Sequence, residues 1–136
     1  MKILGIEHIG IATDDGGRTG EFWENILGLK KSGSEFIASQ KIRTDIYTMS
    51  NGKVELLVPL DMSSVIQTFL DKRGPGIHHI CLEVECIDEA VRELSEKNIP
   101  LVNENPITGA EGYRIIFIHP KGTGGVLVEL AEKPKV

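Results

Sequence analysis

The chain contains one pattern twice, and this repeat constrains the fold more than any other feature. A segment Ile-Glu-His-Ile-Gly-Ile-Ala contains His8, and a later segment Val-Glu-Leu-Leu contains Glu55. A second segment, Ile-His-His-Ile-Cys-Leu-Glu-Val, contains His79, and a later Val-Leu-Val-Glu-Leu contains Glu129. The two His-to-Glu separations are almost equal. A repeated unit must form the same supersecondary structure each time, so we expect two similar modules that each supply one histidine and one glutamate.

The order of hydrophobic runs, turn residues and helical patterns is the same in both halves. Each half reads as strand, helix and three further strands, which predicts an α+β fold of two βαβββ modules. The modules are expected to form a cupped mixed sheet with helices on its outer face. Module one covers about residues 1–73 and module two about 77–136, within a single domain of residues 1–136, and the Gly-Pro-Gly at 74–76 is the expected junction.

Most of these elements have clear limits in the sequence. A short helix is expected over Glu21–Leu27, closed by Gly28, and a second one over Ser63–Lys72, capped by Ser63 or Ser64. Asp88 is expected to cap the helix of the second module. The strands with limits in the sequence are 3–13, 29–39, 41–49, 53–59, 77–85, 115–119 and 125–131, seven of the eight that two such modules require.

Strand alternation predicts that each of the four repeated polar residues lies on the strand face opposite to the aliphatic residues. Successive side chains on a strand point to opposite sides of the sheet. His8, Glu55, His79 and Glu129 each alternate with branched aliphatic residues. The aliphatic faces are therefore expected to pack against helices, and the other faces to carry two imidazoles and two carboxylates.

These four side chains together match the chemistry of a divalent metal site. Two neutral imidazoles and two carboxylates balance the charge of a divalent cation, and mixed nitrogen and oxygen donors suit Co²⁺, Ni²⁺, Mn²⁺ or Zn²⁺ better than Ca²⁺. Four protein ligands on an octahedral ion leave two positions open for a substrate. Any one of these residues taken alone is more often a surface or core residue, so the prediction rests on the repeat of the pair.

The sequence resembles the vicinal oxygen chelate superfamily, which includes glyoxalases, bleomycin-resistance proteins and dioxygenases, and within it most resembles the methylmalonyl-CoA epimerase family. The resemblance covers nearly the whole chain. Its most specific parts are the Gly-Ile-His-His stretch that starts at Gly76 and the His-Pro-Lys stretch that starts at His119. The matching stretches are residues 6–12, 54–57, 73–81, 117–121 and 124–130.

The resemblance implies a fold, a cofactor and a reaction. It implies paired βαβββ modules around a divalent metal held by His8, Glu55, His79 and Glu129. It also implies an isomerase that interconverts the C2 epimers of methylmalonyl-CoA by proton abstraction through a metal-stabilised enolate. Glu129 would be both ligand and base, and Asp45, ten residues before Glu55 across a hairpin, is a candidate second base. For Asp45 the alternative is a solvated strand carboxylate.

Two other functions fit the same residues. A glyoxalase I-like lactoylglutathione lyase uses the same His/Glu/His/Glu set on a hemithioacetal. Non-catalytic relatives that bind a ligand in the cup without metal form the second alternative, but the presence of all four ligand types argues against them.

The composition of the chain limits the kinds of partner that the protein is expected to bind. A net charge of −5 and the absence of a dense Lys/Arg run argue against nucleic acid. The first apolar stretch is interrupted by Glu7 and His8 before it could serve as a signal peptide, and no segment approaches a membrane span. Cys81 and Cys86 are expected to be free thiols in a reducing, cytoplasmic location. The expected partners are a small acyl-CoA thioester and a second copy of the chain in a homodimer, because modules of this kind leave open strand edges.

Overall fold

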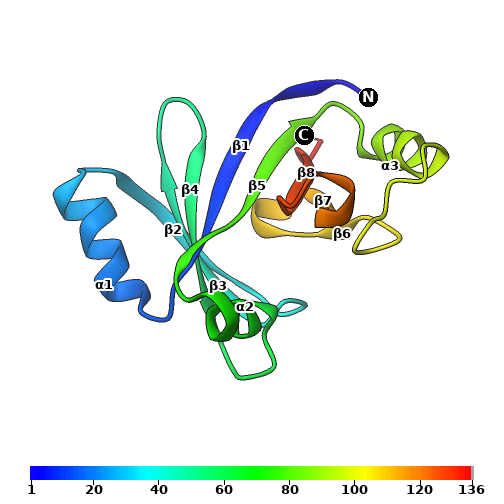
Figure 1. Ribbon diagram of the computed structural model, residues 1–136. Coiled ribbons are helices and arrows are strands. Elements are labelled where there is room, and N and C mark those ends of the chain that lie inside the picture. Colours follow the sequence, from blue (N-terminus) through cyan, green and yellow to red (C-terminus); the bar gives the residue numbers. More distant parts are fainter. Residues whose placement is uncertain (136) are drawn as a thin grey trace. The chain divides into compact units, whose positions relative to one another are not determined.

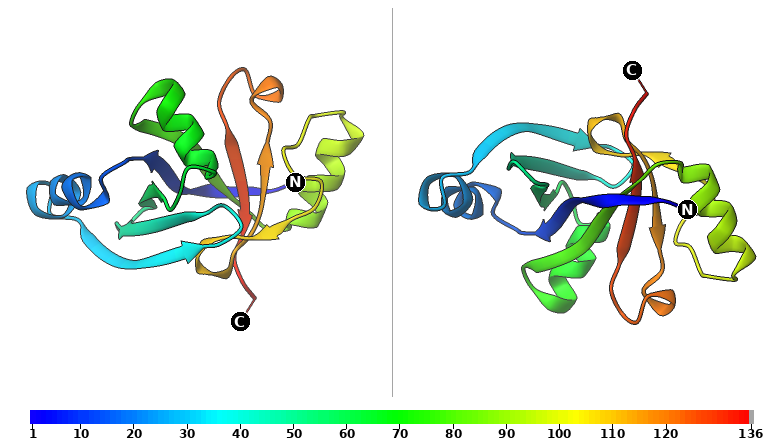
Figure 2. Two further views of the ribbon diagram at one scale, coloured as in Figure 1. Left: turned by 90° about the horizontal axis from the view of Figure 1, so that it is seen from below. Right: turned by 90° about the horizontal axis from the view of Figure 1, so that it is seen from above.

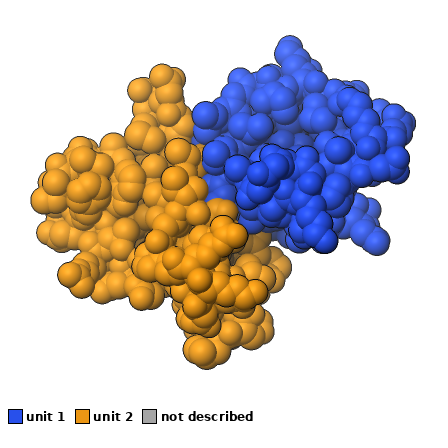
Figure 3. All heavy atoms as spheres, viewed as in Figure 1, with its two compact units in different colours: residues 1–7, 79–136 blue, residues 8–78 orange. Residues whose placement is uncertain are grey.

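The structure is a computed structural model that describes residues 1–135. These residues form two compact units, one of residues 8–78 and one of residues 1–7 together with 79–135 (Figure 3). The first strand and the fifth strand each contribute to both units, so the N-terminal seven residues group with the second half of the chain.

The order of elements confirms the predicted α+β class and the repeat (Figure 1). Each half contains strand, helix and three strands, and one extra helix, α2, connects the halves. The strands are β1 (Ile3–Ala12), β2 (Lys30–Ile37), β3 (Ile42–Thr48), β4 (Lys53–Pro59), β5 (Gly76–Val84), β6 (Ile107–Thr108), β7 (Arg114–Ile118) and β8 (Val128–Glu132). The helices are α1 (Gly16–Glu21), continued by the π-helical turn η1 (Phe22–Ile26), α2 (Val65–Arg73), α3 (Ile87–Glu96), and the 3₁₀ turns η2 (Ala110–Gly112) and η3 (Pro120–Gly122).

In the unit of residues 8–78 the strands lie in the order β2-β3-β4-β1, with β1 parallel to β4 and the other pairs antiparallel. Both faces are covered by helices. On one face Tyr47, Val54 and Leu56 pack with Trp23 of η1. On the other face Leu57 packs with Ile66 of α2. This unit therefore encloses two small cores, one on each side of its strands.

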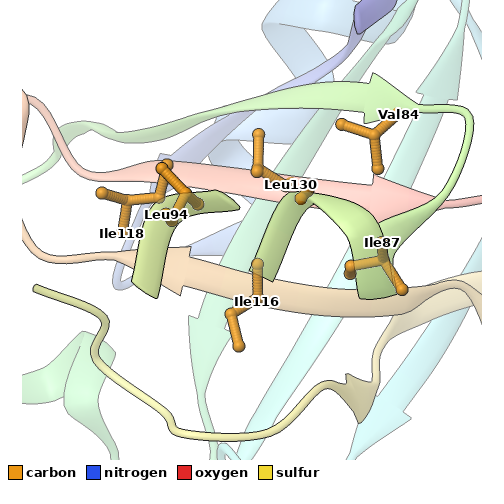
Figure 4. Close-up of a cluster of buried hydrophobic side chains, with 7 residues drawn as sticks. Val84, Ile87, Leu94, Ile116, Ile118 and Leu130 are labelled. Carbon is orange, nitrogen blue, oxygen red and sulfur yellow. The ribbon is translucent and has the colours of Figure 1, made fainter. Parts of the chain in front are cut away.

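The second unit has the strand order β5-β8-β7-β6 and one main core beneath α3. Figure 2 shows α3 running alongside β7, and Figure 4 shows the side chains between them. Ile87 and Leu94 of α3 meet Ile116 of β7 and Leu130 of β8, and all four side chains are buried. The aliphatic face of these strands thus packs on a helix, as strand alternation predicted.

Helix α1 begins earlier than predicted and ends in a wider turn. It starts at Gly16, because the Asp15 side chain accepts a hydrogen bond from the Arg18 amide at 3.0 Å. The chain then widens into the π-helical turn, in which the Leu27 amide donates to the Phe22 carbonyl at 3.0 Å. The prediction of a helix starting at Glu21 missed the first turn because two glycines occupy it. Among residues 1–135, no helix is long and apolar enough to cross a membrane.

The cap of helix α3 differs from the prediction. The residue before α3 is Cys86, whose side chain makes no capping hydrogen bond, and Asp88 lies inside the helix. Glu132, from the end of β8, instead accepts a hydrogen bond from the Ile87 amide at 2.9 Å. Asp88 pairs with the Arg114 guanidinium through two bonds of 3.0 and 3.1 Å, and these hydrogen bonds lower the pKa of the Asp88 carboxyl. The cap therefore comes from a residue distant in sequence, which local sequence reading could not find.

This distant cap leads to a first prediction. Replacing Glu132 with Ala leaves the buried Ile87 amide without its acceptor and should lower the free energy of unfolding by about 1–2 kcal/mol. Glu132→Gln keeps an acceptor oxygen and should retain most of that stability. The measurement is urea denaturation. Glu96→Ala, at an exposed position of the same helix, is the control and should change stability by less than about 0.5 kcal/mol; an equal loss in both variants would contradict the capping role.

Candidate metal centre and active site

The first predicted pair, His8 and Glu55, lies on neighbouring parallel strands β1 and β4. His8 Nδ1 is 3.2 Å from Glu55 Oε2, and both side chains are buried. Glu55 lies between Gly10 of β1 and Ile46 of β3. The parallel pairing of β1 with β4 therefore brings together a histidine and a glutamate that are far apart in sequence.

The second predicted pair repeats this arrangement on β5 and β8. His79 Nε2 is 3.0 Å from Glu129 Oε1, and both side chains are buried. Cys81 and Phe117 are the cross-strand neighbours of Glu129, and the Phe117 ring meets the His79 ring edge-on with centroids 5.6 Å apart. The pair thus lies against an apolar wall that favours a fixed orientation of both side chains.

Both pairs lie on the strand faces that alternation predicted. Leu82 and Leu130 pack beneath α3, whereas Cys81 and its neighbours Ile115 and Ala131 form a separate cluster on the side of Glu129. In the other unit, Val54 and Leu56 pack toward η1, on the face opposite to Glu55. Each unit therefore holds one buried imidazole beside one buried carboxylate.

The donor set of each pair is suited to a metal ion. A neutral imidazole nitrogen and a carboxylate oxygen are ordinary ligands for first-row divalent ions. Two buried ionisable groups at such short range are costly unless a partner, a shared proton or a cation compensates them. Within each unit, the residues present therefore fit half of a divalent metal site.

Asp45, the candidate second base, lies on a different face of the strands from Glu55. The hairpin between β3 and β4 places Ile46 opposite Glu55 and Asp45 opposite Leu56. Cross-strand partners point to the same side of a sheet, and a one-residue change of register reverses the face. The four-residue loop 49–52 sets this register. Asp45 therefore points away from Glu55, which argues against the second-base role for which the sequence made it a candidate.

The Asp45 carboxylate instead belongs to a buried polar network. Its Oδ1 accepts hydrogen bonds from Ser34 Oγ at 2.6 Å and from Arg43 Nε at 3.2 Å, while its Oδ2 accepts from Arg43 Nη2 at 3.3 Å. The Lys31 ammonium lies 3.8 Å from Oδ1. Asp45 is only 2% exposed, so it is not a solvated strand carboxylate either. Its contacts tie β2 to β3.

A second prediction follows for Asp45→Asn. The substitution should leave catalysis within a few-fold of wild type but lower the free energy of unfolding by about 1–2 kcal/mol, because Arg43 loses its anionic partner. The expected loss of stability is small because the Arg43 side chain is 35% exposed, and solvent weakens an ion pair at such a position. Urea denaturation and a rate assay on the same preparation check both parts. A 10²–10⁴-fold loss of rate at unchanged stability, the usual effect of losing an acid or base, would restore Asp45 as a base.

The structure also reveals a group of polar residues that the sequence analysis missed. They line a cavity of about 410 Å³ beneath α1 and η1, on the same side as Asp45, and include Tyr47 and Lys31. Burial, followed by the nearby Asp45 and Glu24 carboxylates, raises the pKa of the Tyr47 hydroxyl. The four-residue spacing of Gly16 and Gly20 was the one signal in the sequence that could have indicated a space on this side of the helix.

The fold and the paired histidines and glutamates define a protein class. The chain belongs to the Glyoxalase/Bleomycin resistance protein/Dioxygenase superfamily, whose family model matches residues 7–117.

Within this superfamily, several proteins similar to this chain are named as methylmalonyl-CoA epimerases. The mitochondrial methylmalonyl-CoA epimerase of Homo sapiens is 40% identical over 93% of this chain and 73% of its own length. The crystal structure of methylmalonyl-CoA epimerase from Mycobacterium tuberculosis has a TM-score of 0.94 and 39% identity, covering 98% of this chain and 90% of that one. A methylmalonyl-CoA epimerase solved in complex with methylmalonyl-CoA and NH4+ has a TM-score of 0.95 and 30% identity, and the match covers 99% of this chain and 98% of that one.

Proposed function

We propose that this chain is a metal-dependent epimerase that interconverts the C2 epimers of methylmalonyl-CoA. The observation that carries the proposal is the repeated buried pair, His8 with Glu55 and His79 with Glu129, in a chain 40% identical to an epimerase over nearly its whole length. Family likeness alone would fit several chemistries. The identity to epimerases selects proton transfer at the carbon between a thioester and a carboxylate.

The four residues would hold one divalent ion, Co²⁺, Ni²⁺, Mn²⁺ or Zn²⁺. When bound, such an ion supplies Lewis-acid stabilisation of negative charge on substrate oxygens. The imidazoles of His8 and His79 supply neutral donors, and Glu55 and Glu129 supply the compensating charge. The apolar neighbours Cys81 and Phe117 exclude water from the second pair, which strengthens electrostatic interactions there.

The protein's part in the proton transfer falls to Glu129. Its Oε1 faces His79 Nε2, which leaves Oε2 as the oxygen that would exchange the C2 proton on one face of the substrate. Formation of the other epimer requires an acid on the opposite face that delivers a proton there. Glu129 lies on β8 between Cys81 and Phe117 and its side chain is buried, which favours a fixed orientation of the carboxylate. A base fixed in this way works without a reorganisation cost during the reaction.

The direct test is solvent exchange. Metal-loaded protein in D2O should incorporate deuterium at C2 of methylmalonyl-CoA, because removal and return of that proton is the reaction itself. Mass spectrometry of the acyl-CoA measures it. The same preparation is assayed on the hemithioacetal of methylglyoxal and glutathione. No exchange together with turnover of the hemithioacetal would assign the chain to the glyoxalase I-like reaction, and neither activity would favour a non-catalytic binding protein.

We also propose a homodimer in a cytoplasmic location. Strand β2 lies at the edge of the strand order in its unit, and open edges of this kind commonly pair with another chain. Both cysteines are free, which suits a reducing compartment. A sedimentation experiment that shows only monomer at micromolar concentration would contradict the dimer.

A further inference from the structure

A second site lies in the unit of residues 8–78, on the face of β3 that points away from Glu55. It is the cavity of about 410 Å³ beneath α1 and η1, a size in the usual range of small-molecule sites. Every residue that lines it belongs to this one unit. It is separate from the His8–Glu55 pair because Asp45 and Tyr47 point to the opposite side of the strands from Glu55.

The cavity is kept open by two glycines on one side of helix α1. A Cβ added at Gly16 would collide with the Arg43 guanidinium, and one added at Gly20 would lie 2.6 Å from the Tyr47 hydroxyl. At η1 the helix widens into a π-helical turn, a feature found often at functional sites. The space therefore depends on particular residues and is not a packing defect.

Tyr47 is the residue that indicates a ligand. Its side chain is among the most buried of the chain, only 2% exposed, and its hydroxyl lies at the cavity. Within residues 1–135 this hydroxyl makes no hydrogen bond. The hydroxyl oxygen opens onto the cavity and is not enclosed by protein, so a molecule in the cavity can reach it. A polar ligand in the cavity would supply the missing partner.

The charges around the cavity are separated by element. The helical side carries two carboxylates, Glu21 of α1 and Glu24 of η1, whereas the strand side carries Lys31 of β2 and Arg43 of β3. Asp45 neutralises only part of the positive charge on the strand side. A ligand that complements both sides must itself carry a cation at one end and an anion at the other.

We infer that this cavity is a second binding site, for a small zwitterion of the amino-acid type. The ammonium group of the ligand binds Glu21 and Glu24, and its carboxylate binds Lys31 and Arg43. The Tyr47 hydroxyl forms a hydrogen bond with the ligand. Asn25, also at the cavity, can add a further hydrogen bond. The inference concerns a different site from the proposed metal centre and holds whether or not the epimerase proposal does.

The test uses full-length metal-free protein and five probes. Glycine, β-alanine and 4-aminobutyrate vary the distance between the two charges, and propionate and propylammonium each carry one charge only. Ligand-observed NMR titration should show saturable binding of at least one zwitterion with a Kd of about 1 mM or below, a reasonable affinity for so small a ligand. The single-charge probes should bind at least about 10-fold more weakly.

Variants locate the site. Gly20→Ala, which fills the space beside Tyr47, should weaken binding at least about 10-fold, and Tyr47→Phe about 3–10-fold for the loss of one hydrogen bond. Glu24→Gln gives a third measurement if Gly20→Ala folds poorly. Gly76→Ala adds the same methyl group where no atom lies within 4 Å and should leave binding unchanged, as should Glu129→Gln.

Three results would overturn the inference. One is the absence of saturable binding of any zwitterion to wild type. Another is equal binding of propionate or propylammonium, which would mean that only one charge is recognised. The third is wild-type affinity in both Gly20→Ala and Tyr47→Phe, which would place the bound molecule elsewhere.

Discussion

Glu129→Gln should abolish most of the deuterium exchange into methylmalonyl-CoA, with a loss of about 10²–10⁴-fold at saturating metal. The amide cannot take the C2 proton, and it replaces an anionic ligand with a neutral one. Glu129 is buried, and its Oε1 lies 3.0 Å from His79 Nε2. No carboxylate from solution can therefore reach the position that Glu129 occupies. Metal content, measured on the same protein, should fall as well.

The matched control is Glu132→Gln. This residue lies on the same strand, is also buried, and differs in that its carboxylate binds the start of α3. Side chains three apart on a strand point to opposite faces. Glu132→Gln should therefore keep both metal and exchange. If Glu129→Gln retained full exchange, neither of the roles proposed for Glu129 would stand, whereas retained metal with lost exchange would identify it as a base rather than an essential ligand.

Repetition and strand alternation were enough to predict much of the fold and both His–Glu pairs. The repeat predicted the order of elements, and alternation predicted that the aliphatic residues beside Glu129 pack under a helix, which the core beneath α3 confirms. These two signals depend on periodicity, which a sequence displays directly. The binding of one metal ion by His8, Glu55, His79 and Glu129 stays a prediction.

The errors came from features that periodicity does not display. The face of Asp45 could not be predicted, because the length of one hairpin loop sets the register and a shift of one residue reverses every side chain of the strand. Asp88 was expected to cap α3, but the cap comes from Glu132, which is distant in sequence. The cavity beside Tyr47 exists only because a helix packs across several strands. Each of these depends on tertiary contacts rather than on local pattern.

The second large effect is expected in the core beneath α3. Ile116 is completely buried and packs with Ile87 and Leu94 of the helix (Figure 4). Ile116→Ala removes three carbon atoms from this cluster and leaves a cavity that the strand cannot close. Large-to-small changes of this kind cost about 2–5 kcal/mol. For a domain of this size, that loss corresponds to a fall in Tm of roughly 10–20 °C.

Two further variants make this prediction specific. Ile116→Val removes a single methyl group and should cost only about 0.5–1.5 kcal/mol. Ile107→Ala makes the same substitution at a position that is 38% exposed, so it should cost less than about 1 kcal/mol. Thermal and urea denaturation of the three variants should therefore give a graded series. Equal losses for Ile116→Ala and Ile107→Ala would mean that the α3 core does not dominate the stability of its unit.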